Sequence, residues 1–256
     1  MRNTSILKSA LLAALLALSP AAVLAQKPGG APATPPQGFD PELPASDLLV
    51  RYEAPVLRFR WSLPAEASLE PALVRLMRKE ALADREATLV QAKQASAPGQ
   101  RKFQSEWHER WLPEAETDLL LAFSTHHYEF TGGAHGIMAF RSVIWDRSAE
   151  QRISFGQLLT DRKAAMAAVK PVFCKALDDE RKERRGGQLG SDFADCLDPA
   201  AYPIVPEGEG EISSFRVLVP PYEAGPWSEG TYEISLPVSL IRPFLLPRYA
   251  PAFARD

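Results

Sequence analysis

"TDLLLAFSTHHYEFTGGAHGIMAFRSVIWD", residues 117–146, decides the fold of this chain, because it holds two strand-like runs joined by a short connector. Residues 117–130 and 137–146 are rich in β-branched and aromatic side chains, which is typical of strands. Only residues 131–136 lie between them. The stretch therefore predicts a β-hairpin whose turn is longer than the tightest two-residue types.

The connector contains three glycines, Gly132, Gly133 and Gly136. Glycine adopts positive φ at little steric cost and lets another segment approach the backbone closely. A phosphate-binding loop does not fit, because the connector lacks lysine and precedes a strand rather than a helix. We therefore expect these glycines to shape a turn.

Outside the hairpin, the apolar pattern predicts two long helices and further strands. One helix begins near Ser68 as N-cap and ends before residues 96–100, and the other covers residues 162–184. The other predictions are a strand over 48–63 interrupted near Pro55, an acidic loop over 206–211, and strands over 214–220 and 231–237. Since helices and hairpins do not alternate regularly, we expect an α+β fold: an antiparallel or mixed sheet with two main helices packed on one face.

The first 47 residues are expected to lie outside the folded domain. Residues 1–25 combine a basic start, an apolar run and a small-residue site, as cleavable signal peptides do. The next segment carries six prolines and few large apolar side chains, the composition of a disordered tether. The expected divisions are a signal peptide 1–25, a tether 26–47, an α+β domain 48–246 with an N-terminal lobe 48–115 and a C-terminal lobe 116–246, and a tail 247–256.

Cleavage after Ala25 predicts a periplasmic or secreted protein with no membrane span in its mature form. Removing Arg2 and Lys8 from the 29 basic residues leaves 27 against 32 acidic residues, a formal net charge of −5. A negative net charge argues against a large nucleic-acid-binding surface. We therefore expect no nucleic acid among the partners.

The chain has two cysteines, Cys174 and Cys196. Export to an oxidising compartment favours a disulfide between them, and the absence of a C-x-x-C motif favours a structural role over a redox role. The bridge would close a loop of about 20 residues, worth about 3 kcal/mol of stability in the chain-entropy model.

The hairpin carries three of the four histidines, which raises the question of catalysis. Because side chains alternate along a strand, His126 and His127 point to opposite faces and do not easily bind one ion. A hydrolytic site would have to combine His135 with Glu129 and His126, and neither metal-ligand spacing nor a GxSxG elbow supports it. We expect a non-catalytic protein with no cofactor or metal; an envelope hydrolase using these three residues and a purely structural periplasmic protein are the alternatives.

Three motifs point to a known family: "YEFTGGAHG" at 128–136, "ISFGQLLTD" at 153–161 and "FRVLVPPYEAGPWSEGTYEISLP" at 215–237. Together they resemble the extracytoplasmic domain of RsiV-type anti-sigma factors and PdaC-type peptidoglycan deacetylases. This is a domain family of unknown function with a Y-x-Y-T-G-G-A-H-G motif. Phe130 stands where the family usually has tyrosine, and Trp227 replaces a common tyrosine.

The resemblance covers roughly residues 48 to 246 and implies an exported recognition domain of the bacterial envelope. In RsiV-type proteins the domain binds lysozyme, so the implied partners are a lysozyme-like protein or peptidoglycan. Neither the cytoplasmic anti-sigma segment nor the deacetylase domain of these relatives is found in the sequence, so neither of those effector activities is expected.

The segment "PPYEAGPW" is the predicted binding surface. Tyr222 and Trp227 are large amphipathic side chains on a proline-rich segment, an arrangement that lowers the ordering cost of binding. Glu223, Glu229 and the acidic residues within 207–211 add negative charge that would attract a cationic partner. His135 is a further binding candidate. The alternative is that both aromatic side chains fold inward and cap the sheet.

Overall fold

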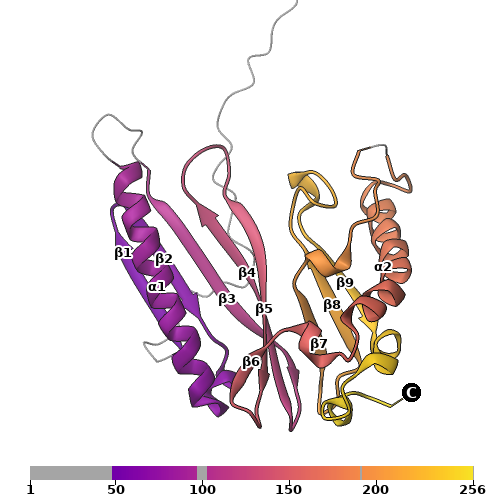
Figure 1. The fold of residues 1–256 in the computed structure, drawn as a ribbon. Helices are drawn as coiled ribbons and strands as arrows, with labels where there is room; N and C mark the ends of the chain where they lie inside the picture. The colour runs from indigo at the N-terminus through magenta and orange to yellow at the C-terminus, as the bar shows by residue number, and fades with distance from the viewer. Residues whose placement is uncertain (1–47, 97–102, 191, 256) are drawn as a thin grey trace, which may run out of the picture. The chain divides into compact units, whose positions relative to one another are not determined.

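The structure is a computed structural model that describes residues 48–96, 103–190 and 192–255. The expected signal peptide and tether lie outside the described residues. The described part is an α+β fold with a mixed sheet and two long helices, which confirms the predicted fold class (Figure 1). The helices are α1 (Pro71–Ala95) and α2 (Arg162–Arg184). The strands are β1 (Leu49–Ala54), β2 (Leu57–Ser62), β3 (Ser105–Glu116), β4 (Leu120–Phe130), β5 (Ile137–Asp146), β6 (Gln151–Ile153), β7 (Ile204–Glu209), β8 (Ser214–Val219) and β9 (Tyr232–Pro237).

The predicted hairpin is confirmed and lies at the centre of the sheet. Strands β4 and β5 pair antiparallel from Leu120↔Asp146 to Glu129↔Ile137. The sheet continues in the order β6-β5-β4-β3-β7-β8-β9. Strand β3 pairs with β4 along one edge, while its other edge pairs with β2 over residues 105–110 and with β7 at 115–116. A register shift between Pro113 and Ala115 separates these two pairings.

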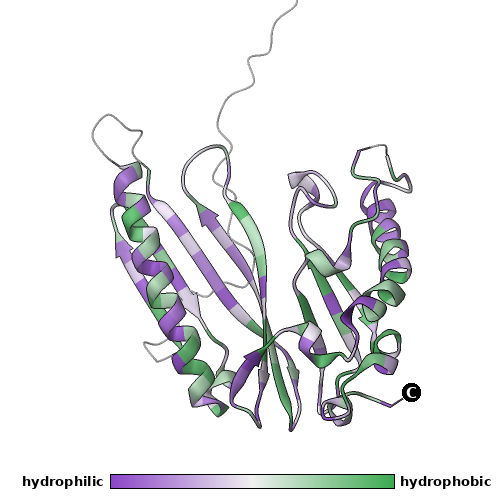
Figure 2. Ribbon diagram, viewed as in Figure 1, coloured by the Kyte–Doolittle hydropathy of each residue, from purple (hydrophilic) through white to green (hydrophobic). Residues whose placement is uncertain are grey.

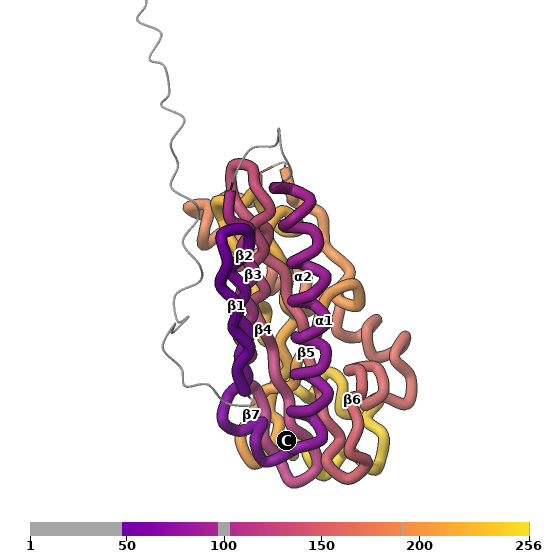
Figure 3. The backbone as a smooth tube through the Cα atoms, turned by 90° about the vertical axis from the view of Figure 1, so that its left-hand side faces the viewer, coloured from indigo at the N-terminus to yellow at the C-terminus, as the bar shows by residue number. Residues whose placement is uncertain are grey.

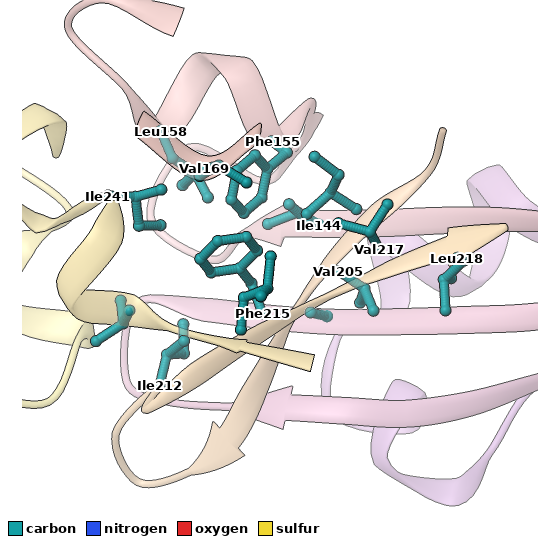
Figure 4. Packing of buried hydrophobic residues seen from close by; sticks show 14 of the residues in the cluster. Ile144, Phe155, Leu158, Val169, Val205, Ile212, Phe215, Val217, Leu218 and Ile241 are labelled. Carbon is teal, nitrogen blue, oxygen red and sulfur yellow. The ribbon is translucent and has the colours of Figure 1, made fainter. Parts of the chain in front are cut away.

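Each of the hairpin's faces belongs to a different hydrophobic core. One face packs with α1 and strands β1–β3 through large apolar side chains: Leu121, Phe123, Val143, Trp145, Trp107, Trp111, Leu73 and Met77. The opposite face contributes to a second core with β7–β9 and α2, in which the ring centroids of Phe155 and Phe215 lie 5.4 Å apart. Figure 4 shows Ile144 of β5 among the β7–β8 side chains of this core.

The expectation that both helices pack on one face was wrong. Helix α1 contacts β1 and β2, and Figure 3 shows it running alongside these strands. Helix α2 contacts β9 instead, through apolar side chains such as Val169 and Phe173 that alternate with polar ones (Figure 2). The two helices belong to different cores because β4 and β5 are apolar on both faces. A single layer of helices would leave one of these faces uncovered.

Several boundaries of helices and strands differ from the prediction. Residues 48–63 form two antiparallel strands rather than one, with the interruption at Pro55 as expected, and α1 begins at Pro71 after Glu70 rather than after Ser68. The predicted acidic loop is largely strand β7. The C-terminal residues set apart as a tail pack into the second core, where Tyr249, Ala252 and Phe253 are buried.

The glycines of the connector behave as predicted. Gly132 and Gly133 have φ of 102° and 104°, in the region that favours glycine. Gly136 has a different role: a Cβ added there would lie 2.5 Å from the Tyr128 ring and 2.7 Å from the Glu129 carbonyl oxygen. The connector therefore folds back over the strand it leaves, and only glycine leaves room for the ring.

The predicted disulfide between Cys174 and Cys196 is formed, with 5.3 Å between the two Cα atoms. It ties the segment after α2 to that helix at Cys174, which is partly buried against the second core. We predict that replacing both cysteines with alanine lowers the free energy of unfolding by about 3 kcal/mol, because the unfolded chain is no longer crosslinked. Urea unfolding measures this. Dithiothreitol should lower the stability of the natural chain by a similar amount and leave the double variant unchanged; a natural chain insensitive to the reductant contradicts the prediction.

Candidate functional site

The two loops singled out in the sequence meet in the structure. His135 lies in the β4–β5 connector, and Tyr222 and Trp227 lie in the loop between β8 and β9. His135 Nε2 is 3.1 Å from the Tyr222 hydroxyl, and the imidazole stacks on the Trp227 ring at 4.3 Å between centroids with 15° between planes. The Tyr222 and Trp227 rings are 5.9 Å apart. We call His135, Tyr222 and Trp227 the aromatic surface.

The hydrogen bonds of His135 define its protonation pattern. Its Nδ1 is 2.8 Å from the Gly136 carbonyl oxygen, which only accepts, so Nδ1 carries the proton. In the neutral imidazole Nε2 is then the acceptor, and the Tyr222 hydroxyl donates to it. Both ring nitrogens are therefore hydrogen-bonded within the protein, and the Nε2 lone pair is directed at the Tyr222 hydroxyl.

The aromatic surface is open to solvent. The Tyr222 side chain is 54% exposed, Ile137 next to the connector is 66% exposed, and His135 and Trp227 are partly buried. Tyr222 has a φ of 71°, a left-handed conformation that a bulky residue adopts at a cost of about 1–2 kcal/mol. Such strain persists where the surroundings hold the backbone in place.

Three arginines at the end of α2 hold the backbone of the β8–β9 loop. Arg181, which is fully buried, donates from Nε to the Ala224 carbonyl oxygen at 2.9 Å. Arg184 donates from Nη1 to the carbonyl oxygens of Glu229 and Thr231, at 2.6 and 2.7 Å. Carbonyl groups before and after Trp227 are thus bound to one helix. We call Arg181, Arg184 and Arg185 the arginine clamp.

Arg185 completes the clamp through a two-pronged ion pair with Glu229. Its Nε and Nη2 lie 2.8 and 2.9 Å from the two carboxylate oxygens, and both side chains are largely buried. The Tyr232 hydroxyl also donates to Glu229. These bonds from Arg185 and Tyr232 outweigh burial and lower the pKa of the Glu229 carboxyl. Gly225 leaves the room that this carboxylate occupies, because a Cβ there would lie 2.1 Å from it.

Glu223, a predicted binding residue, has a partner within the protein. Its carboxylate accepts a hydrogen bond of 2.9 Å from the Tyr202 hydroxyl, and burial together with this bond raises the pKa of Tyr202 to about 12. The Glu223 side chain is exposed, but the bond ties it to the start of β7. Glu223 therefore contributes to positioning the loop beside Tyr222.

The three residues of the hydrolase hypothesis do not assemble. Glu129 lies on the α1 side of the sheet, 3.8 Å from His127. On the opposite side, His126 Nε2 is 3.2 Å from Glu233, which also pairs with Arg216 at 3.1 Å. His135 belongs to the aromatic surface instead. Across residues 48–96, 103–190 and 192–255, no group of three or more His, Cys, Asp or Glu side chains could hold a metal ion.

Comparison with known proteins gives structural neighbours of unknown function. No family model matches the chain, and no curated protein does. This chain is similar to a DUF3298 family protein from Pseudomonas aeruginosa PAO1, with 18% sequence identity and a TM-score of 0.45. The similarity covers 78% of this chain and 87% of the Pseudomonas protein. It is also similar to a member of the DUF3298 family from Bacteroides fragilis NCTC 9343, with 16% identity and a TM-score of 0.46, over 75% of this chain and 85% of the Bacteroides protein. No ligand is named for either protein.

The arginine clamp was not predicted from the sequence, and Glu229, expected to attract a cationic partner, is instead bound by Arg185. The signal was present as the cationic run "RKERR", residues 181–185, at the end of the second predicted helix. Cations are favoured at helix C-termini by the helix dipole alone, so the run did not point to a partner segment. The connection needs the β8–β9 hairpin to be placed beside α2, and that placement is a property of the tertiary structure.

We predict that Glu229→Gln destabilises the protein in a pH-dependent way. Since the pKa of Glu229 in the folded state lies below its ordinary value of 4.5, its contribution is present above that value and is lost as the pH falls through the folded-state pKa. We expect a loss of about 1.5–3 kcal/mol at neutral pH, the range for hydrogen bonds to charged groups, and a smaller loss at about pH 3.

Urea unfolding of the natural chain and the variant at both pH values measures the difference. Glu183→Gln is the matched control, because it removes the same charge from an exposed position on α2, the helix that carries the arginine clamp. Hydrogen exchange should also show faster exchange in residues 221–231 of the Glu229 variant. A destabilisation that does not change with pH would contradict the assigned ion pair.

Proposed function

We propose that the protein is an exported, non-catalytic recognition protein of the bacterial envelope, which binds a cell-wall-related ligand through the aromatic surface. One observation carries the proposal: two loops whose key residues are 87 positions apart in the chain meet in a hydrogen bond between His135 and Tyr222. Trp227 stacks on the same imidazole. The residues that the sequence marked for binding thus form one exposed cluster.

The construction of the site favours binding over catalysis. Tyrosine and tryptophan provide most of the binding energy at many protein interfaces, and they do so best when they are held in place before the ligand arrives. The arginine clamp fixes the loop on one side, and the turn of Gly136 over Tyr128 fixes the connector on the other. No serine, threonine or cysteine belongs to the aromatic surface, so the nucleophile–histidine pair of the common hydrolases is not formed there.

Two ligands fit the proposal, a lysozyme-like protein and peptidoglycan. A formal charge of −5 after signal cleavage favours the approach of a cationic protein such as lysozyme, mainly through the association rate. Aromatic faces with a hydroxyl group at the edge suit a glycan as well, because a sugar ring offers both apolar C–H faces and hydroxyls. An exported protein would meet either ligand at the cell wall.

Calorimetric titration of the protein over residues 26–256 with hen lysozyme, and separately with soluble peptidoglycan fragments, tests the proposal. We predict saturable binding to one of them that Trp227→Ala and Tyr222→Ala each weaken by about tenfold or more, the loss typical of truncated aromatic anchors. Phe193→Ala, which truncates an exposed aromatic side chain elsewhere, is the control and should change the affinity little. Absence of heat with both ligands at high concentration would remove the proposal.

Cell fractionation tests the predicted export. In a Gram-negative host, a fusion of the full chain to an epitope tag should appear in the periplasmic fraction or medium at a mass reduced by residues 1–25. Retention of the full-length mass in the cytoplasm would contradict the expected signal peptide. None of the described helices is long and apolar enough to cross a membrane.

A further inference from the structure

A cavity of about 410 Å³ lies away from the aromatic surface. Its walls come from β5, the β6 end, the short helix Phe155–Leu158, the first turns of α2 and the segment before β7. Cavities of about 300–1,000 Å³ are the usual size of small-molecule sites. The size therefore suits a small organic ligand, and the lining indicates which kind.

One side of the cavity is apolar. Ile144, Phe155 and Met166 line it and belong to the second hydrophobic core. Ser142 of β5 adds a hydroxyl group next to Ile144 on the strand face turned towards this core. A ligand with a short hydrocarbon body would bury that body against these side chains, and each methylene removed from water favours binding.

The other side carries a cation with no carboxylate beside it in the lining. Arg162 lines the cavity, and no Asp or Glu does. The Arg162 side chain packs over Gly156, where an added Cβ would lie 2.9 Å from the Arg162 Cδ. Its Nη2 donates to the Ala200 carbonyl oxygen at 3.2 Å. Arg162 therefore spans two walls of the cavity. Arg152 also lines it, but its guanidinium pairs with Glu80 of α1 at 2.7 Å.

Positive charge continues beyond Arg162. A neighbouring cavity of about 400 Å³ shares Arg162, Met166 and Ala200 with the first, and is lined further by Lys163 and Lys170. Its single acid, Asp198, already accepts a backbone hydrogen bond from Ala200. Among the described residues neither lysine forms a salt bridge, so three cations and one carboxylate face this region of a chain whose formal charge is negative.

We propose that the cavity binds a small amphiphilic anion, with its carboxylate or phosphate group on Arg162 and its hydrocarbon body against Ile144, Phe155 and Met166. A guanidinium binds both kinds of anion through two parallel N–H donors, and Arg162 uses one of its nitrogens for the Ala200 carbonyl oxygen. The proposal is independent of the aromatic surface, because none of His135, Tyr222 and Trp227 lines either cavity.

The test uses three probes with the same chain length: octanoate, octyl phosphate and 1-octanol, each titrated into ¹⁵N-labelled protein and followed by NMR. We expect saturable shifts for at least one anion, confined to amides of residues 142–144, 152–166 and 200–204. The neutral alcohol should bind at least about tenfold more weakly, since it lacks the charge that Arg162 recognises. Which anion binds more tightly distinguishes a carboxylate site from a phosphate site.

Two variants locate the site. Arg162→Gln should weaken binding of the anion about tenfold or more and bring its affinity close to that of octanol, while Ser142→Leu should fill the cavity and reduce the affinity for all three probes. Arg75→Gln removes the same charge from an exposed position on α1 and should change nothing. Thermal unfolding shows whether each variant is folded.

Trp227→Ala should leave anion binding unchanged, so a failure of the aromatic surface as a recognition site and a failure of this proposal remain separate results. The proposal is overturned if neither anion gives saturable shifts, if octanol binds as tightly as the anions, or if a folded Arg162→Gln protein keeps the natural affinity. If Ser142→Leu does not fold, the arginine variant and the octanol comparison still decide the outcome.

Discussion

Both faces of the β4–β5 hairpin are buried, and successive side chains along each strand therefore belong to different cores. In β4, Phe123 packs on the α1 side, while Ala122 faces β7–β9 and α2. A slip of one residue in the pairing would exchange the two sets and place every side chain in the wrong core. The register from Leu120↔Asp146 to Glu129↔Ile137 is thus fixed from both sides, and with it the position of the connector.

The aromatic surface depends on that register. His135 reaches Tyr222 only because the hairpin ends where it does, and Gly136 sets the direction in which the connector leaves the sheet. On the other loop, Tyr222 has a left-handed backbone, and its N–H donates to the Gly225 carbonyl oxygen at 3.0 Å. The neighbouring Ala224 carbonyl oxygen is the one that Arg181 of the arginine clamp binds. Neither loop by itself contains all three residues, so the surface exists only in the folded domain.

The sequence predicted the parts of the fold in which one face is clearly apolar. The α2 boundaries, the hairpin and the β8–β9 pair all follow from regular periodicity and clear turn residues. The sequence did not predict β3, because polar or proline residues interrupt the apolar pattern on both faces of this strand. Glu109 is 1% exposed on the side that carries Trp107 and Trp111, and Pro113 lies inside the strand. Buried acids and prolines are rare in strands, so the segment did not look like one.

The same failure explains the helix placement. Without β3, the chain offers no β2–α1–β3 crossover, and a parallel pair such as β2 and β3 requires one. With that crossover α1 covers the β1–β3 side of the sheet, and the opposite face of β4 and β5 becomes available to β7–β9.

For the site, the sequence identified the residues that meet but not what holds them. Tyr222, Trp227 and His135 are of types that stand out in loops, because large aromatic side chains and histidine there lack an obvious core role. Arg181, Arg184 and Arg185 stand at a helix end, where cations are ordinary. Their function depends on the Ala224, Glu229 and Thr231 backbone lying opposite them, about 40 residues further along the chain. Local sequence patterns carry no information about such pairings between distant segments. Yet it is the arginine clamp that fixes the proline-rich loop, with its one strained tyrosine, in a single position.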